Sequence, residues 1–252
     1  MPLLETRGSG SALSYGLNGS IQVIPAAVTS GLALFVDAGQ IASYPGSGNL
    51  WKDISGNNKN GTIINGSTFS ANNSGSLGFN GTNQYVSFGD LGYNALTAMT
   101  MQMFVKVNAN SGSYNGFAGS QYGGNDFSTG FNWDQGPVST SSFNSLGYEG
   151  TFHPGWVDTK NTDTPFGQWV NIAVTATSGG TMYLYTNGVQ DGTMALSSGT
   201  MGTQAFTLAA RPYNAGTTGL NGSIGQAMFY TRVLSQSEIQ SNFNKFKSRY
   251  GL

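Results

Sequence analysis

The chain has 252 residues, which is enough for a full hydrophobic core, and all-β domains of this size are often single units. Only 8% of the residues are charged and the formal net charge is −1, which excludes a basic protein drawn to nucleic acid or anionic membranes. Aromatic residues make up 12% of the chain and supply apolar area for folding, so the 38 glycines indicate many tight turns and not disorder.

The first 30 residues differ in composition from the rest. Residues 8–17 are small, with isolated apolar anchors, as in an arm that becomes ordered by docking. The start of the chain has no apolar core of a signal peptide, and the apolar run over 21–38 is broken by proline and glycine and cannot span a bilayer. We therefore expect an arm over 1–30 and one domain over 31–252, without membrane insertion.

Apolar and polar residues alternate along much of the domain. This period of two is typical of strands with one buried face, and Asn-Gly turns separate several of the segments. No unit of 20–50 residues repeats, which argues against a solenoid or a propeller. The predicted strands lie within residues 32–37, 77–88, 101–107, 169–174, 182–185, 206–208 and 224–230.

One helix is predicted near the C-terminus. Ser235 and Glu238 have the spacing of a capping box, and Leu234 and Ile239 are placed as a hydrophobic staple across it. The basic residues at the far end match the negative end of a helix dipole and do not indicate a nucleic-acid patch. An apolar stripe at helical spacing would pack on the sandwich through Ile239, Phe243, Phe246 and Tyr250.

Residues 51–62 form the most specific segment, W-x-D-x-S-G-N-x-x-N-G-T, in which an aromatic anchor and an aspartate precede a turn rich in Gly and Asn. The segment resembles the first signature of the laminin-G-like, concanavalin A-like sandwich domains. The resemblance implies an all-β antiparallel jelly-roll β-sandwich with a short C-terminal α-helix, here preceded by an extended N-terminal arm. Further elements similar to this family stand in the expected order, at residues 34–38 and 44–48 before this segment and at residues 79–86, 167–174, 185–192 and 221–235 after it.

Two interpretations of Asp53 are open. It either caps its own loop or holds calcium together with neighbouring carbonyl oxygens, the ligands that this hard cation prefers. The resemblance implies an Asp-Glu pair at the place where this chain has Gly225 and Gln226. The loss of both carboxylates argues against a metal there, so calcium at Asp53 is the one cofactor we consider.

The resemblance also covers glucanases, which place two carboxylates on either side of the scissile bond. The strand pattern E-x-D-x-E is absent, and Asp126 and Asp134 have no further support as an acid–base pair. A nucleophile–base arrangement would have to use the single His153, because the chain has no cysteine. We expect no catalysis, and a glycan hydrolase that uses Asp126 or Asp134 is the least favoured alternative.

Residues 114–156 resemble the family least and combine aromatic rings with amides and carboxylates, which suits sugars. Trp51 and Trp169 are expected in the core, whereas Trp133 and Trp156 stand near turn residues and are expected in the core or at the surface with equal weight. The candidate glycan-binding residues are Tyr122, Asn125, Asp126, Trp133, Asp134, His153 and Trp156.

The leading hypothesis is a non-enzymatic surface protein of a tailed-phage virion, either a capsid decoration or a tail or fibre component. Residues 8–17 resemble short segments at the ends of tailed-phage tail proteins, and residues 1–30 would contact other virion proteins, in a homo-oligomer assembled in the host cytoplasm. Weak contacts with host surface glycans would be multiplied by copy number, and no nucleic acid would bind. The alternative is a carbohydrate-binding module of a bacterial surface or secreted protein.

Overall fold

The computed structural model describes most of the chain from Ala26 onward. Side chains are described for these residues except 142–143, 147–149 and 153–158. The described residues are 26–110, 115–120, 130–135, 142–143, 147–158, 162–212, 215 and 217–252.

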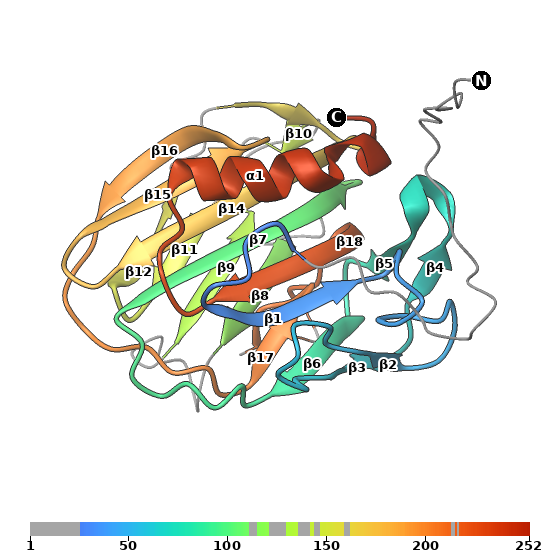
Figure 1. Cartoon of the computed structure of the whole chain (residues 1–252), viewed down its shortest axis with the longest axis horizontal. Coiled ribbons are helices and arrows are strands. Elements are labelled where there is room, and N and C mark those ends of the chain that lie inside the picture. Colours follow the sequence, from blue (N-terminus) through green and yellow to red (C-terminus); the bar gives the residue numbers. More distant parts are fainter. Residues whose placement is uncertain are drawn as a thin grey trace, which may run out of the picture.

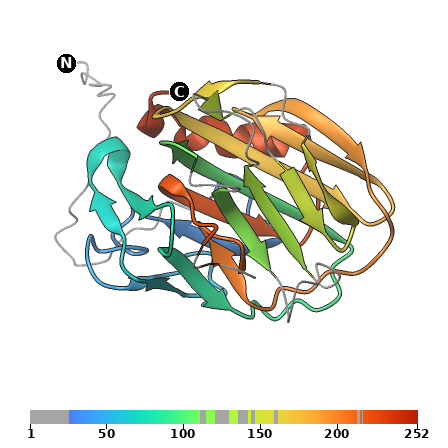
Figure 2. The same cartoon turned by 180° about the vertical axis from the view of Figure 1, so that it is seen from behind.

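Two antiparallel sheets face each other, as Figures 1 and 2 show from opposite sides. We call the first the helix-side sheet, and β1 (Leu32–Asp37) pairs with its strand β18. Its order is β16 (Val189–Ala195), β15 (Thr181–Thr186), β14 (Trp169–Thr177), β7 (Ala98–Val107), β18 (Asn221–Tyr230), β5 (Ser76–Asn80) and β4 (Thr68–Ser70). The opposite sheet has the order β12 (His153–Asp158), β11 (Gly147–Gly150), β9 (Phe131–Gln135), β8 (Asn115–Ser120), β17 (Phe206–Leu208), β6 (Tyr85–Gly89), β3 (Gly61–Ile64) and β2 (Leu50–Trp51). A small separate pair joins β10 (Ser142–Phe143) and β13 (Thr164–Pro165).

The main core lies between the two sheets, because alternate residues of each strand point inward. The inward side chains of β7 and β18 continue the apolar alternation noted in the sequence. The largest buried rings of this core belong to Trp51, Trp133, Phe117, Phe131, Phe206 and Phe229. The prediction of an all-β antiparallel sandwich is confirmed.

A second apolar layer covers the outer face of the helix-side sheet. The helix α1 (Gln236–Phe246) lies across that face and continues into the 3-10 turn η4 (Lys247–Tyr250) (Figure 1). The predicted stripe is confirmed, since its four side chains pack on Phe35, Phe104 and Trp169 from the sheet. No helix among the described residues is long and apolar enough to cross a membrane.

The capping box at the start of α1 is present. The Ser235 hydroxyl accepts a hydrogen bond from the Glu238 N–H at 3.3 Å, and the Glu238 carboxylate accepts one from the Ser235 N–H at 2.8 Å. Arg232 Nη2 also donates to Glu238 Oε1 at 2.6 Å. These donors, Arg232 first, lower the pKa of Glu238 from 4.5 to about 2.

The substitution Glu238→Gln is expected to reduce the free energy of unfolding at pH 7 by about 0.5–1 kcal/mol, because the box and its ion pair are partly exposed. Since the folded-state pKa lies below its ordinary value, this contribution is complete above pH 4.5 and is lost as the pH falls toward about 2. Denaturant titrations from pH 7 to 2 should therefore converge for the two proteins. The exposed Asp163→Asn serves as the control, and a constant difference down to pH 2 would contradict the assignment.

Residues 26–30, the described part of the predicted arm, are docked on the sandwich. Asn242 Oδ1 on α1 accepts from the Val28 N–H at 3.0 Å, and the Tyr230 hydroxyl on β18 donates to the Val28 carbonyl at 3.0 Å. Both backbone groups of Val28 are thus held by side chains that are themselves buried. Residues 1–25 lie outside the described residues, and the role predicted for them is unchanged.

Candidate functional site

Asp53 organises the loop that first identified the fold. Its Oδ1 accepts from the N–H groups of Phe35 and Ser55 at 3.0 and 2.8 Å, and its Oδ2 from the Ser55 hydroxyl and the Lys59 N–H at 2.9 and 3.0 Å. These four donors occupy the four lone-pair directions of the carboxylate. The structure therefore supports the capping interpretation, and calcium at Asp53 stays a prediction.

Two of the predicted glycan contacts are wrong. The Trp133 side chain is fully buried, with its ring centroid 5.9 Å from that of Phe117 in the core between the sheets. Asp134 is fully buried as well, and its Oδ2 accepts from Arg211 Nε at 2.6 Å. Trp133 faces the core between the sheets, and its neighbour Asp134 lies on the other face of β9, where Arg211 pairs with it; all five residues of this strand are buried.

The other predicted contacts fall where the structure describes less. Tyr122, Asn125 and Asp126 lie outside the described residues. His153 and Trp156 are placed on β12, but their side chains are not among those described. All five stay predictions.

The place of the missing Asp-Glu pair is occupied by the C-terminal turn. The ladder between β18 and β7 is irregular at Gly225, and a Cβ there would lie 2.7 Å from Cζ of Tyr250. Beside it, Asp37 stands opposite Gln226 in register and binds both terminal nitrogens of Arg249 at 2.7 Å. The Arg249 guanidinium thus supplies the positive charge beside Asp37. The sequence patterns did not predict this pair.

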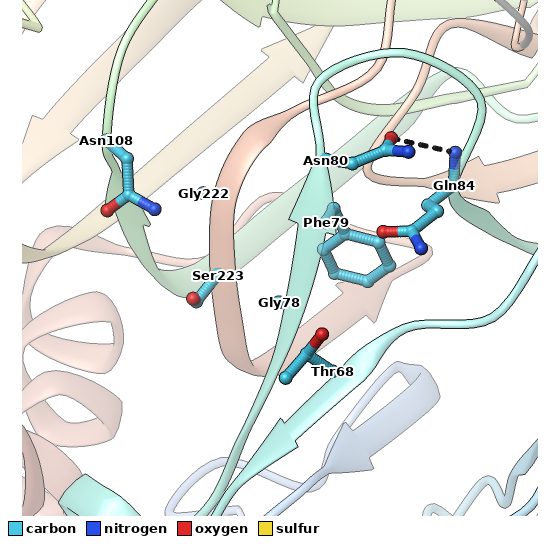
Figure 3. A pocket seen from close by; sticks show the side chains of 8 residues that line it. All are labelled: Thr68, Gly78, Phe79, Asn80, Gln84, Asn108, Gly222 and Ser223. Carbon is cyan, nitrogen blue, oxygen red and sulfur yellow. Dashed lines mark hydrogen bonds between the residues drawn. The ribbon is translucent and has the colours of Figure 1, made fainter.

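A hollow of about 250 Å³ opens on the helix-side sheet near the ends of β5, β18 and β7 (Figure 3). Across β4, β5 and β18, Thr68 stands opposite Gly78 and Gly78 opposite Ser223. Because Gly78 has no side chain, the space between the side chains of Thr68 and Ser223 stays open. Its lining residues are Thr68, Gly78, Phe79, Asn80, Gln84, Asn108, Gly222 and Ser223.

Part of this lining is committed to shaping the hollow. Asn80 Oδ1 accepts from the N–H groups of Thr82 and Asn83 at 3.0 and 3.2 Å, and its Nδ2 donates to Asn83 Oδ1 at 3.1 Å. Asn80 thereby fixes the turn from β5 to β6. Its motif Asn-Gly-Thr is a turn signal in the sequence, and nothing local shows that the turn borders a hollow.

Three other polar side chains of the lining are turned toward the hollow. The hydroxyls of Thr68 and Ser223 and the amide of Asn108 belong to exposed or half-buried residues and face the hollow (Figure 3). None of the eight lining residues is charged. Such neutral donors and acceptors can hydrogen-bond sugar hydroxyls but cannot serve as a general acid–base pair. The described residues also contain no cluster of three or more His, Cys, Asp or Glu side chains that could hold a metal.

A sequence model of the concanavalin A-like lectin/glucanases superfamily matches residues 80–240, more than half of the chain. The chain belongs to this superfamily. The resemblance recognised in the sequence is thus confirmed. The comparison with curated proteins finds no match.

Solved structures of this superfamily fold are similar to the chain at low sequence identity. Domain 4 of AbnA, a GH43 extracellular arabinanase from Geobacillus stearothermophilus in complex with arabinotriose, matches with a TM-score of 0.61 and 17% identity, covering 84% of this chain and 97% of that one. The binding domain of Paraclostridial Mosquitocidal Protein 1 matches with 0.65 and 16%, covering 86% and 53%. Trypanosoma rangeli sialidase in complex with sialic acid matches with 0.64 and 15%, covering 91% and 36%. At these identities the likeness shows the fold alone.

Proposed function

We propose that the chain is a glycan-binding domain and that the hollow between β4, β5 and β18 contributes its sugar contacts. The observation that carries the proposal is the lining itself: exposed hydroxyl and amide groups over a glycine floor, on a lectin-type sandwich. Amide and hydroxyl groups offer both donors and acceptors to a sugar ring at little desolvation cost. The arabinotriose on one similar domain supports sugars as the ligand class.

Binding without catalysis fits the described carboxylates. A glycosidase needs two carboxyl groups about 5–10 Å apart beside an open cleft. Asp134 is instead paired with Arg211 and has no exposed area. A hydrolase that uses Asp134 is therefore disfavoured, and one that uses Asp126 would show turnover of a polysaccharide that is lost in Asp126→Asn.

Asn108→Ala and Ser223→Ala are each expected to weaken oligosaccharide binding about 5- to 10-fold, the value of one lost hydrogen bond. A glycan array with and without calcium selects the sugar, and calorimetry then compares the variants. Gln190→Ala is the matched control, because Gln190 is exposed on β16, at the other edge of the sheet. An array that stays flat in both conditions, or unchanged affinity in both hollow variants, would contradict the proposal.

Display on a tailed-phage virion, as a capsid decoration or a tail or fibre component, is the finer part of the proposal. It is supported by the small-residue composition of residues 8–17 and by the docking of residues 26–30 on the sandwich, as expected of an arm that becomes ordered by docking. Deletion of residues 1–25 should leave a folded sandwich that no longer enters particles. Normal incorporation of the truncated protein would reject the assembly role.

The second candidate is a carbohydrate-binding module of a surface or secreted bacterial protein. It is favoured by the match that covers 97% of one domain of an extracellular arabinanase. Genes for capsid or tail components beside this one would support the virion, whereas an export signal upstream of Met1 would support the module. Both candidates use the same hollow.

A further inference from the structure

One cationic side chain stands beside the hollow. Lys106 on β7 is opposite Ser223 on β18 and opposite Trp169 on β14. Because Val105 points into the core between the sheets and Trp169 belongs to the layer under the helix, strand alternation places Lys106 on the same outer face as the hollow. Asn108, which lines the hollow, follows directly after the end of β7, where its N–H donates to the Asn221 carbonyl of β18 at 2.9 Å.

The hollow and the lysine form one continuous row across the helix-side sheet. Thr68, Gly78, Ser223, Lys106 and Trp169 are neighbours in register on β4, β5, β18, β7 and β14. The row ends at the ring of Trp169. Gly78 has no side chain and so leaves space in the part of the row that lines the hollow. A ligand in the hollow therefore lies within one strand spacing of the Lys106 side chain.

The ammonium group of Lys106 is positioned by an aromatic ring. Its Nζ lies 5.6 Å from the ring centroid of Trp169, and among the described residues no carboxylate forms an ion pair with it. The ring is itself fixed, since Trp169 Nε1 donates to Asn73 Oδ1 at 3.1 Å and Tyr250 packs against it at 4.8 Å. A cation–π contact orients the ammonium but leaves its charge uncompensated.

We infer that the hollow and Lys106 together bind an acidic saccharide, one whose sugar carries a carboxylate or a sulfate. The anionic group is placed at Lys106, where the Ser223 hydroxyl and the Asn108 amide can donate to it as well. The sugar hydroxyls occupy the neutral part of the hollow. This inference rests on the proposed function and deepens it by naming the ligand class.

Lys106→Gln tests the inference, with Lys247→Gln as the matched control. Lys247 is also a surface lysine over an aromatic ring, 5.4 Å from the centroid of Phe243, but it belongs to η4 and not to the row. Calorimetry on the full chain would use four probes: oligogalacturonate, its carboxyl-reduced counterpart, a sulfated galactan oligomer and its desulfated form. Thermal unfolding of each variant verifies that it is folded.

The unmodified protein and Lys247→Gln are expected to bind at least one acidic probe about 10-fold more tightly than its neutral counterpart, the value of one charge-assisted hydrogen bond. Lys106→Gln should abolish this preference and keep the neutral affinity, whereas Asn108→Ala should weaken both. Which acidic probe shows the preference distinguishes carboxylate from sulfate. Equal binding of acidic and neutral probes by the unmodified protein, or a preference retained in Lys106→Gln, would overturn this inference alone, and the absence of all saccharide binding would overturn the proposed function with it.

Discussion

Replacing Asp37 with alanine is expected to lower the free energy of unfolding by about 3–5 kcal/mol, because it orphans a buried charge. The Asp37 carboxylate has no exposed area and accepts from both terminal nitrogens of Arg249 at 2.7 Å and from the Gly39 N–H at 2.9 Å. Alanine would leave the guanidinium largely buried without an anion. Since Asp37 ends β1 and Arg249 lies in η4, the pair fixes the C-terminal turn to the first strand.

Urea denaturation at pH 7 measures this loss, with Asp163→Ala at an exposed carboxylate as the control. The double substitution Asp37→Leu with Arg249→Met removes both charges and should recover much of the stability, because well-packed apolar residues can replace a buried ion pair. A loss below about 1 kcal/mol in Asp37→Ala would show that solvent reaches the pair and screens it.

Features that depend on neighbours in the sequence were predictable. The capping box of Ser235 and Glu238 and the apolar stripe of α1 are set by spacings of three and four residues, which any helix converts into contacts. The alternation along β7 likewise predicts the face that points into the core between the sheets, although Gln102 and Phe104 on its other face are buried too, under α1. The loop at residues 51–62 identified the fold because most of the contacts of Asp53, those with Ser55 and Lys59, lie within that loop.

Features that depend on strand order were not predictable. The partners Asp37 and Arg249 are 212 positions apart, and no local pattern connects them. Trp133 was ambiguous for the same reason, since the residues around it do not show which face of its strand is turned toward the opposite sheet. The candidate hollow combines Thr68 of β4, Ser223 of β18 and Asn108, which follows β7, and only the pairing of these strands makes them neighbours.

Gly225 and Gln226, where the chain departs from the family pattern, show what the sequence can and cannot predict. The sequence indicates that two carboxylates expected from the family are missing, which is correct and local. It does not indicate that Tyr250 packs against Gly225, closely enough for a Cβ to collide with the ring. A glycine is thus required at position 225 because the Tyr250 side chain packs against it, and not because the backbone turns there.

Trp133→Ala is expected to reduce the free energy of unfolding by about 3–5 kcal/mol, the cost of a large cavity in a packed core. The side chain is fully buried against Phe117, and its indole Nε1 has no hydrogen-bond partner. Trp133→Phe therefore removes volume but no hydrogen bond, and we expect it to lose about 1–2 kcal/mol. Denaturant unfolding of both variants gives the two values.

The same pair separates a core role of Trp133 from the sugar contact predicted for it. If the Trp133 ring stacked on a sugar, it would contribute to the free energy of binding. Its replacement by phenylalanine or alanine would then lower the glycan affinity of the folded protein. A ring in the core affects affinity only through the folded fraction. Trp133→Phe, measured well below its unfolding temperature, should thus keep its affinity within about twofold. A loss of tenfold or more at full folding would place the indole at a binding surface and contradict the packing against Phe117.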